Sequence, residues 1–271
     1  MSFDFNILNE FTGKIFSTSK KQEALCNEVF VLDCEKGKFI LKIANGDLRQ
    51  KQLEKEYCLI NELKNFIYVP AIVVYQKKVG QSFFLMEFIE GNKPSLFTDE
   101  NLRIIAESLK NIHSLKNTNE NVDFNKLLYI AEQNMINGII DLNEFNNNGK
   151  LTQPQEIFNY LKNNQPKVKG CLLHGDYRPK NMLLTHKGLC VLDWGLSFIG
   201  DPYYDIAIFK WYLTQDEFLK FVKYYGIDCI DEQRLFYNEW LSAFLNVWNK
   251  FSKTKHIIIY KFNIETKKNI W

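Results

Sequence analysis

His174-Gly-Asp-Tyr-Arg-Pro-Lys-Asn181 is the most informative stretch of the chain, and Asp193-Trp-Gly195 follows it after a hydrophobic run. In the first stretch, Asp176 and Asn181 lie five residues apart with Pro179 between them. Proline fixes φ and lacks an N–H, so this segment favours a turn over a continuing helix. A turn of this length lets the carboxylate and the amide face one cleft.

The side-chain chemistry of these motifs suits the transfer of a phosphoryl group. Such a transfer needs little covalent participation from an enzyme, because the barrier falls mainly when the reactants are held in line and developing charge is neutralised. One loop must then present a base beside a ligand for a metal ion. Mg²⁺ takes hard oxygen ligands, which Asp and Asn supply, and nothing in the motifs suggests zinc.

Three ordered motifs within 34 residues carry a resemblance to a known family. They are His174-Gly-Asp-Tyr-Arg-Pro-Lys-Asn181, Val191-Leu-Asp-Trp-Gly195 and Gly200-Asp-Pro-Tyr-Tyr-Asp-Ile-Ala207. Together they resemble the antibiotic kinases of the aminoglycoside phosphotransferase family, whose plan choline kinases and several small-metabolite kinases share. Gly175 and Trp194 separate the chain from protein kinases, which carry Arg and Phe at these positions. Ordinary loop carboxylates, the alternative interpretation, would not explain the order of the motifs.

The resemblance implies an α+β fold class with a protein-kinase-like, two-lobed fold. We expect a small N-terminal antiparallel sheet with one helix in residues 1–89, which would bind the nucleotide. A larger, mostly helical lobe in residues 90–271 would carry catalysis and substrate binding.

The resemblance also implies an activity, the ATP- and Mg²⁺-dependent phosphorylation of a hydroxyl on a small molecule. An aminoglycoside-type antibiotic is the leading acceptor, and GTP is an alternative donor. Asp176 would orient or deprotonate the hydroxyl, while Asn181 and Asp193 would bind the metal. Direct in-line transfer is expected, without a phosphorylated enzyme. Two alternatives stay open: a kinase of choline or another metabolite, and a nucleotide-binding pseudokinase that serves as a scaffold.

The composition is that of a globular protein with a substantial core, since 46% of the 271 residues are hydrophobic and 15% are aromatic. The N-terminus, MSFDFNILNE, lacks the basic and apolar segments of a signal peptide, and no run reaches the roughly 18 apolar residues of a membrane span. The six Cys are scattered without CxxC spacing, so we expect them to be reduced. These features predict a cytoplasmic protein.

The net charge of +2 is too small to predict a nucleic acid or an anionic membrane as partner. From residue 250 onward, six Lys stand against one Glu, a surplus of +5 that leaves −3 for the preceding residues. We interpret this tail as a solvated terminus. The sequence gives no sign of whether the protein is a monomer or a dimer.

The N-terminal lobe contains a hairpin predicted over residues 28–44, where hydrophobic residues alternate around a turn. Lys42 lies in its second strand, where the resemblance places a lysine that contacts the α- and β-phosphates. This lysine needs a carboxylate partner. The helix predicted over residues 48–65 offers Glu54 and Glu56, and the resemblance favours Glu56.

Two further strands complete the predicted sheet, and the second is broken by a hinge at Glu90-Gly-Asn92. The resemblance places the nucleotide base against Glu87, Phe88 and Ile89, bound through main-chain N–H and C=O groups. Met86 would flank the base. Simple core packing is an equally good interpretation of Met86 and Phe88, because apolar strand residues usually belong to the core.

The segment expected to cover the phosphates, Ser17–Ala24, contains no glycine. Glycine allows a backbone to approach a phosphate closely, so such an approach is not expected here. Ser17, Thr18 and Ser19 are candidates to contact phosphate through a hydroxyl or an N–H. A plain polar turn is the interpretation that we favour for these residues.

Several residues around the central motif have predicted roles. Arg178 occupies a position where Ser/Thr protein kinases place a lysine that reaches the transferring phosphate, and a guanidinium can bind a phosphoryl oxygen through two hydrogen bonds. Lys180 is the alternative for this role. We expect His174 to hold the loop of Asp176 through a hydrogen bond. Asp205 is predicted to cap a helix and to brace the same loop.

Beyond the hinge, the hydrophobic period becomes that of helices. The first predicted helix carries His113, which we interpret as a core or capping histidine because Asp176 already serves as the base. Further helices are predicted over residues 124–142 and 153–161, separated by a loop at 146–149.

The acceptor is expected to bind among the C-terminal helices, over residues 203–251. Aromatic and acidic side chains are mixed in this region: Trp211, Tyr212, Tyr224, Tyr225, Trp240 and Trp248 with Asp216, Glu217, Asp228, Asp231, Glu232 and Glu239. Such a mixture suits a cationic acceptor. Helical spacing indicates that most of the apolar residues form core, so the sequence does not identify the acceptor.

Overall fold

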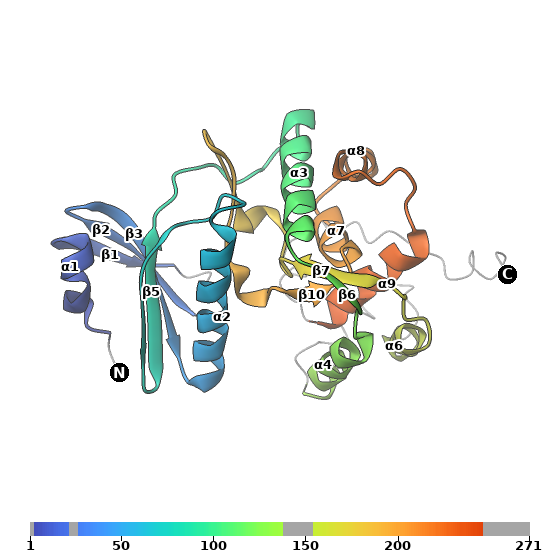
Figure 1. Cartoon of the computed structure of the whole chain (residues 1–271), viewed down its shortest axis with the longest axis horizontal. Helices are drawn as coiled ribbons and strands as arrows, with labels where there is room; N and C mark the ends of the chain where they lie inside the picture. The colour runs from blue at the N-terminus through green and yellow to red at the C-terminus, as the bar shows by residue number, and fades with distance from the viewer. Residues whose placement is uncertain (1–2, 22–26, 138–153, 246–271) are drawn as a thin grey trace. The chain divides into compact units, whose positions relative to one another are not determined.

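The computed structural model describes residues 3–21, 27–137 and 154–245, and its elements are labelled in Figure 1. The strands are β1 (Ile15–Lys20), β2 (Glu28–Cys34), β3 (Gly37–Asn45), β4 (Ile72–Lys78), β5 (Gln81–Glu87), β6 (Asn117–Asn121), β7 (Lys169–Leu173), β8 (Met182–Thr185), β9 (Gly188–Val191) and β10 (Phe198–Gly200). The α-helices are α1 (Asn9–Thr12), α2 (Asp47–Leu63), α3 (Asp99–Leu115), α4 (Phe124–Ile136), α6 (Pro154–Asn163), α7 (Tyr203–Lys210), α8 (Gln215–Tyr225) and α9 (Glu232–Phe244). Short 3₁₀ helices are η1 (Phe5–Leu8), η2 (Pro179–Asn181) and η3 (Trp194–Leu196).

The chain divides by its internal packing into two compact units. The first unit comprises Met1–Ile112 and Arg178–Ser197, and the second comprises His113–Tyr177 and Phe198–Trp271. This partition follows packing alone. The functional boundary expected between residues 89 and 90 stays a prediction.

The first unit is built on a five-stranded antiparallel sheet with the strand order β1-β2-β3-β5-β4. The predicted hairpin forms its centre, and in it Val29 lies opposite Lys42 and Val31 opposite Ile40. Residues that lie opposite one another in an antiparallel pair project from the same face. The hydrophobic alternation of the sequence therefore gives the sheet two distinct faces.

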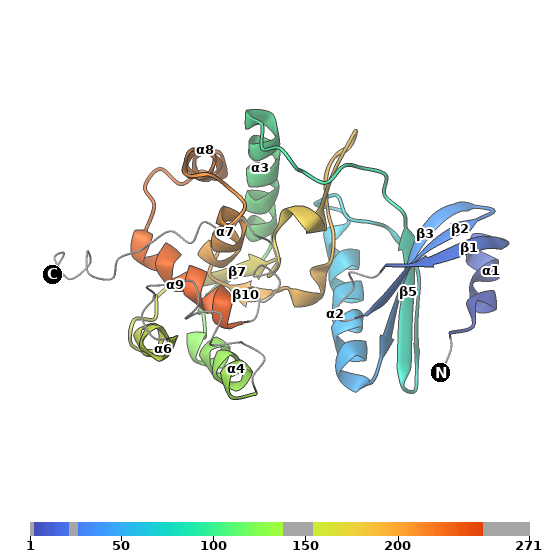
Figure 2. The same cartoon turned by 180° about the vertical axis from the view of Figure 1, so that it is seen from behind.

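Each face of this sheet packs against a different segment of the first unit, as Figures 1 and 2 show for α1 and α2. One face carries Leu41 and packs against the N-terminal segment through Leu8. The other face carries Ile40 and Phe84 and packs against α2 through Leu53. Truncation of a fully buried leucine such as Leu41 to alanine would cost about 2–5 kcal/mol.

A small hairpin, β8 with β9, completes the first unit. The segment after β5 is joined to it by two main-chain hydrogen bonds between Asn92 and Leu184, of 3.0 and 2.8 Å. A Cβ on Gly91 would meet the carbonyl oxygen of Leu184 at 2.9 Å, so this approach requires glycine. The hinge segment is thereby attached to the hairpin that precedes Asp193.

The second unit is mostly helical and surrounds a three-stranded antiparallel sheet, β10-β7-β6. Its core joins α4, α6, α7 and α9 with β7, and it includes the buried rings of Phe158 and Phe244. Polar caps define where helices begin. Thr214 and Glu217 form a capping box at α8, and Asp231 caps α9.

The predicted α+β architecture is confirmed: a small antiparallel sheet with one long helix precedes a mostly helical remainder. The polar turn expected at residues 17–19 is wrong, because these residues belong to β1 and Thr18 pairs with Leu32 of β2. The loop predicted at 146–149, the residue Trp248 and the Lys-rich tail lie outside the described residues.

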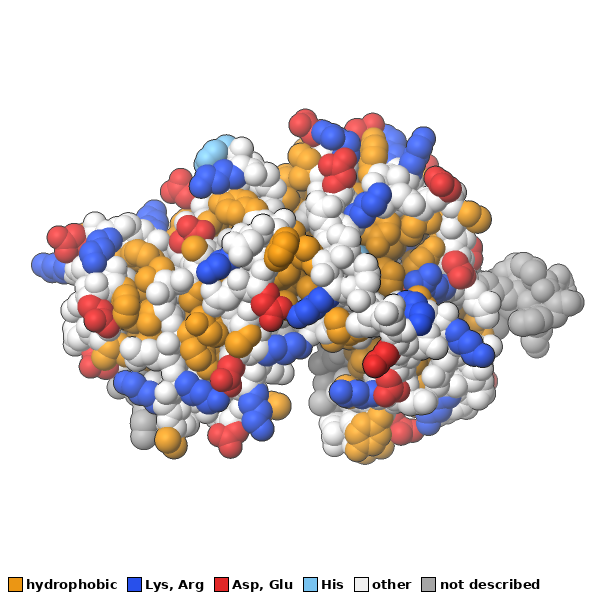
Figure 3. Space-filling model, in the orientation of Figure 1, with side chains coloured by type: hydrophobic (Ala, Val, Ile, Leu, Met, Phe, Trp, Pro, Cys, Tyr) orange, Lys and Arg blue, Asp and Glu red, His pale blue; other side chains and the backbone are white. Residues whose placement is uncertain are grey.

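Charged side chains of both signs are interspersed over the face of the molecule shown in Figure 3. This mixture agrees with a net charge of only +2. Within the described residues, no helix combines the length and the hydropathy needed to cross a membrane.

Candidate functional site

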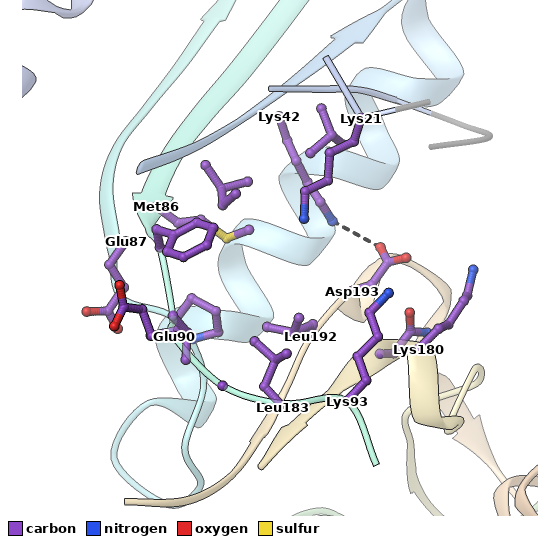
Figure 4. A pocket seen from close by; sticks show the side chains of 17 residues that line it. Lys21, Lys42, Met86, Glu87, Glu90, Lys93, Lys180, Leu183, Leu192 and Asp193 are labelled. Carbon is purple, nitrogen blue, oxygen red and sulfur yellow. Dashed lines mark hydrogen bonds and ion pairs between the residues drawn. The ribbon is translucent and has the colours of Figure 1, made fainter. Parts of the chain in front are cut away.

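A cavity of about 590 Å³ lies in the first unit (Figure 4). Six of the predicted site residues line it: Lys42, Glu87, Phe88, Ile89, Asn181 and Asp193. The remaining lining includes apolar side chains such as Val29, Ile40 and Leu192. A mostly apolar pocket of this volume with a few convergent polar groups is typical of small-molecule sites.

Lys42 lines this cavity and forms ion pairs with two carboxylates. Its Nζ lies 2.7 Å from Oε1 of Glu56 and 3.0 Å from Oδ1 of Asp193. The side chains of Lys42 and Glu56 are 9% and 2% exposed, whereas that of Asp193 is 51% exposed. Burial lowers the pKa of Lys42, but the negative charges of Asp193 and Glu56 outweigh burial and raise this pKa. Lys42 is therefore a cation held between a buried and a half-exposed carboxylate.

The helix geometry of α2 explains why Glu56 rather than Glu54 binds Lys42. Lys42 projects from the face of β3 that α2 covers, and Glu56 is buried against that face. Residues two positions apart in a helix, such as Glu54 and Glu56, project in directions that differ by about 200° around the helix axis. Glu54 accordingly points elsewhere, and it binds Lys77 at 2.7 Å with a side chain that is 41% exposed. The predicted pairing of Lys42 with Glu56 is confirmed, while their role toward a nucleotide stays a prediction.

Asp193 has an unusual backbone conformation. Among the described residues it is the one non-glycine residue with a positive φ, 66°. Such a conformation costs about 1–3 kcal/mol and persists only where the surroundings enforce it. Here Trp194 is fully buried, its Nε1 donates to the carbonyl of Val191 at 3.0 Å, and its carbonyl accepts from Oγ of Ser197 at 2.8 Å. The buried tryptophan thus anchors a turn that directs the Asp193 carboxylate to the cavity, as Figure 4 shows.

Asn181 is held beside Asp193 by main-chain bonds. Its N–H donates to the carbonyl of Arg178 at 2.9 Å, and its carbonyl accepts from the N–H of Leu192 at 2.8 Å. Both Asn181 and Asp193 line the same cavity. An amide and a carboxylate are the hard oxygen donors that Mg²⁺ takes, so the residues present fit this ion.

The end of β5 contributes main-chain groups to the cavity. The N–H of Glu87 donates to the carbonyl of Ala71 at 3.0 Å. The N–H of Phe88 donates to the carbonyl of Lys38 at 3.3 Å. Within the described part of the chain, the N–H of Ile89 makes no such bond. Of the three residues predicted to bind a base, Ile89 therefore has the available main-chain donor.

The flap side of the cavity is formed by Lys21 and not by Ser17. Ser17 lies opposite Asp33 in β1, four positions before Lys21, and it does not line the cavity. Four residues of a strand span roughly 13 Å, which places Ser17 far from the row of Lys42. The role of Ser17 at the phosphates stays a prediction without support from this geometry. Lys21 could have been found by its register with Val29, had β1 been recognised as a strand.

In the second unit, Asp176 lies on a buried loop that follows β7. Asp176 is 2% exposed, and His174 is fully buried. The N–H of Asp176 donates to Nδ1 of His174 at 3.2 Å, which confirms the hydrogen bond predicted for this histidine. Gly175 between them has a φ of 79°, a conformation that residues with side chains rarely adopt. Glycine therefore fits this position, where protein kinases carry arginine.

Asp205 braces this loop through both carboxylate oxygens. Oδ2 accepts the N–H of His174 at 2.7 Å, and Oδ1 accepts the N–H of Gly175 at 2.9 Å. Nε2 of His113 lies 3.2 Å from Oδ2 of Asp205, and Nδ1 of His113 lies 2.8 Å from the hydroxyl of Tyr225. The bracing role predicted for Asp205 and the structural role predicted for His113 are confirmed.

The capping role predicted for Asp205 is wrong, because α7 begins two residues before it. Asp201 is the residue at the start of this helix, where its Oδ1 accepts the N–H of Tyr203 at 2.9 Å. The Asp201 carboxylate also accepts two hydrogen bonds from Nε of Arg234, at 2.7 and 2.9 Å. The motif spacing did not distinguish the two acids, and only the tertiary contacts do.

Arg178 lies in the first unit, is 2% exposed and does not line the cavity. Lys180, two residues further on, does line it. The catalytic role of Arg178 stays a prediction, and the structure brings the alternative, Lys180, to the cavity that contains Asp193.

Several of the residues proposed to bind the acceptor have a structural role instead. Phe236 and Trp240 are buried in the core of the second unit, which confirms that the apolar residues of α9 are mainly core. Glu217 and Asp231 cap helices, and Glu239 forms an ion pair with Lys210. These contacts account for half of the acidic residues considered, so the acceptor surface is not defined by them.

The amino-acid sequence is similar to that of known phosphotransferases. Residues 25–235 match the phosphotransferase enzyme family, APH. The aminoglycoside 3′-phosphotransferase of Campylobacter jejuni is 21% identical over 164 residues, which cover 57% of this chain. The match spans 64% of the length of that relative.

Solved structures of the same fold include three complexes. The aminoglycoside phosphotransferase of Streptomyces rimosus with ADP and streptomycin has a TM-score of 0.67 at 17% identity, covering 88% of this chain and 96% of that one. A spectinomycin phosphotransferase with ADP and spectinomycin has a TM-score of 0.65 at 17% identity, covering 97% and 91%. The GDP and kanamycin complex of APH(2″)-IIIa has a TM-score of 0.67 at 19% identity, covering 89% and 86%.

At these identities the likeness establishes the fold, and the predicted kinase-like fold is confirmed. The sequence match extends over most of the 271 residues and includes the Lys42 hairpin as well as the motifs of Asp176 and Asp193. This chain belongs to the phosphotransferase enzyme family.

Proposed function

We propose that this protein is a small-molecule kinase that transfers the γ-phosphate of ATP to a hydroxyl of its acceptor. The observation that carries the proposal is Lys42, which joins the buried Glu56 to the half-exposed Asp193 at the wall of a cavity of about 590 Å³. A buried ion pair with only a structural role would not open onto a ligand-sized space. Here a carboxylate and a cation of the same cluster line a ligand-sized space.

The two ends of the cavity suit the two ends of a nucleotide. Ile89 offers a main-chain N–H for the base, and apolar residues such as Val29 and Leu192 suit a flat ring. Lys42 offers a charge-assisted hydrogen bond to phosphate oxygens. Solved relatives of the same fold were captured with ADP and with GDP, which supports a purine nucleotide. ATP is the proposed donor, and GTP is the alternative.

Asn181 and Asp193 are the residues that would hold Mg²⁺. The bound ion would neutralise charge on the phosphate oxygens. The Lys42 ammonium keeps the Asp193 carboxylate in one orientation, and the buried Trp194 keeps the backbone of Asp193 in its left-handed turn. The chain therefore supplies a positioned donor set rather than a flexible one.

In the proposed reaction, Asp176 accepts the proton of the acceptor hydroxyl. The hydroxyl oxygen forms a bond to the γ-phosphorus while the bond from that phosphorus to the β,γ-bridging oxygen breaks, and ADP leaves. The two hydrogen bonds from the backbone at His174 and Gly175 to Asp205 hold the loop of Asp176 for this task. The transfer is direct, so no phosphorylated enzyme forms.

An aminoglycoside-type antibiotic is the proposed acceptor. The family match supports this class, and relatives of the same fold were solved with streptomycin and kanamycin. A choline or metabolite kinase and a scaffold without catalysis are the alternatives that an acceptor panel separates.

The test is ADP release from Mg-ATP and Mg-GTP, with and without aminoglycosides, other hydroxylated antibiotics, choline and small metabolites. Asp176→Ala is the inactive variant, and Asp33→Ala, an exposed acid away from the cavity, is the matched control. We expect one acceptor class to stimulate ADP release in the wild type and in Asp33→Ala, and none to do so in Asp176→Ala. Nucleotide binding without turnover on any acceptor would contradict the proposal and favour a scaffold.

A further inference from the structure

The flap that would cover the phosphates lacks the usual means of binding them. Between Gly13 and Gly37 the sequence contains no glycine, so no position there allows a glycine-type close approach of backbone to phosphate. The N–H of Lys21 donates to the carbonyl of Val29 at 2.8 Å. The N–H of Lys21 is engaged with the neighbouring strand and is not offered to a ligand, so a phosphate contact from Lys21 requires its side chain.

The strand register directs the side chain of Lys21 toward the cavity. Lys21 lies opposite Val29, and Val29 lies opposite Lys42. Because opposite residues share a face, Lys21 and Lys42 project from the same side of the sheet. Two strand spacings separate their backbones by roughly 10 Å, a distance that two lysine side chains directed to the same space can bridge with a ligand between them. Figure 4 shows both ammonium groups directed into the cavity on the side of Asp193.

The lysine next to it behaves differently. Lys20 projects from the opposite face, because successive residues of a strand alternate. Its Nζ lies 2.7 Å from Oε2 of Glu28 and 5.7 Å from the centre of the Phe30 ring. Lys20 does not line the cavity, whereas Lys21 does, and among the described residues the ammonium of Lys21 has no carboxylate partner.

The charge of the cavity is unevenly distributed along its length. Its lining includes four lysines, Lys21, Lys42, Lys93 and Lys180. Figure 4 shows these lysines around Asp193, with Glu87 and Glu90 at the other end. Glu56 already neutralises Lys42, so the end at Asp193 has more positive than negative groups. Ammonium groups directed to one space repel one another, and a polyanion relieves that repulsion.

We propose that Lys21 is a phosphate-binding residue whose side chain replaces the main-chain N–H groups of a glycine-containing flap. It contacts the β- or γ-phosphate of the nucleotide. This proposal rests on the proposed function, because it names a residue of the same nucleotide site. Its consequence is that the protein distinguishes nucleoside di- and triphosphates from monophosphates through a side-chain charge on the flap.

The test compares Lys21→Ala with Lys20→Ala, which removes the same charge from the neighbouring position on the other face. Lys21→Arg is the conservative variant. Calorimetry on the full-length protein would give the dissociation constants of ATP, ADP, AMP and adenosine at fixed Mg²⁺, and thermal melts would verify that each variant folds. We expect Lys21→Ala to weaken ATP and ADP about tenfold, with AMP and adenosine changed less than about twofold, as the loss of one charge-assisted bond predicts. Lys20→Ala should leave all four unchanged, and Lys21→Arg should restore most of the ATP affinity.

The possible failures are distinguishable. If the wild type binds ATP and Lys21→Ala binds it equally well, the role of Lys21 is wrong and the proposed function stands. If Lys21→Ala weakens adenosine as much as ATP, Lys21 shapes the cavity and does not bind phosphate. If the folded wild type binds no nucleoside triphosphate at all, the proposed function is wrong, and the role of Lys21 is wrong with it.

Discussion

The two units hold their central carboxylates in different ways. In the first unit, Asp193 is half-exposed, occupies a left-handed turn and is positioned by the charge of Lys42. In the second unit, Asp176 is 2% exposed on a loop whose backbone N–H groups are bound by Asp205. The first arrangement consists of ionic contacts that a polyanion can join. The second consists of directional hydrogen bonds that fix one geometry before any ligand arrives.

This difference separates binding from chemistry. Changes in the first unit should alter nucleotide affinity, because its lysine side chains bind the phosphate groups. Changes in the loop of the second unit should alter turnover while nucleotide affinity stays constant, because its hydrogen bonds position a proton acceptor. Each of the following predictions tests whether the two units differ in this way.

The largest effect is expected from Asp176→Asn, which keeps the size of the side chain and removes its basicity. We expect kcat to fall about 10³-fold, as for the loss of a general base. The dissociation constant of ATP should change less than about twofold, since Asp176 is not a lining residue of the nucleotide cavity. Steady-state kinetics and calorimetry on the same sample measure both. A tenfold loss of ATP affinity would show that the separation is wrong.

The second prediction compares two glutamates on α2. Glu56→Gln leaves a buried Lys42 with a weakened partner set, so we expect it to lower the free energy of unfolding by about 3 kcal/mol and to weaken ATP binding. Glu54→Gln removes an exposed ion pair with Lys77 and should cost less than about 1 kcal/mol. Urea denaturation followed by fluorescence measures both variants. An equal loss in the free energy of unfolding for both variants would mean that the buried Lys42–Glu56 pair stabilises the protein no more than an exposed ion pair does.

A third, smaller effect is expected in the second unit. Asp205→Asn places an amide where two backbone N–H groups need an acceptor, and we expect kcat to fall about tenfold at unchanged ATP affinity. Tyr225→Phe removes only the hydroxyl that contacts His113 and should change kcat less than about threefold. If Asp205→Asn changed ATP affinity more than kcat, the loop would not be an independent positioning device.

The smallest effect concerns thiol reactivity. Among the described cysteines, Cys58 and Cys229 are exposed, and Cys171 and Cys190 are buried. Burial raises the pKa of Cys171 and of Cys190 to about 12. The reactive thiolate forms as pH rises through the pKa, so at pH 8 these two should carry about 10⁻⁴ of the thiolate form. Labelling with a disulfide reagent and peptide mapping should find Cys58 and Cys229 modified first. Fast labelling of Cys190 would show that the first unit opens readily.

The part of the site that the sequence predicted well consists of groups fixed by local spacing. The hairpin alternation places Lys42 on the face that α2 covers. Asn181 lines the cavity and Asp176 does not, so a single cleft for these two residues stays a prediction. The pairing of Lys42 with Glu56 needed the family resemblance, because periodicity alone left Glu54 as an alternative. In the structure, these two side chains project about 200° apart around α2, so Glu56 contacts Lys42 and Glu54 contacts Lys77.

The features that the sequence did not predict depend on tertiary contacts. β1 is polar, so no hydrophobic alternation marks it, and its pairing with β2 defines it. Without that strand, the register that directs Lys21 to the cavity could not be deduced. The left-handed turn of Asp193 depends on the burial of Trp194, and the brace at Asp205 depends on contacts with a loop about thirty residues away.

The most direct test of the account follows the phosphorus atom itself. Wild-type protein is incubated with Mg²⁺ and ATP labelled with ³²P at the γ position, together with the acceptor class that stimulates ADP release. We predict that the label appears on the small molecule in amounts equal to the ADP formed, and that none accumulates on the protein. Label on a protein side chain, or only in inorganic phosphate, would contradict direct transfer to a hydroxyl acceptor.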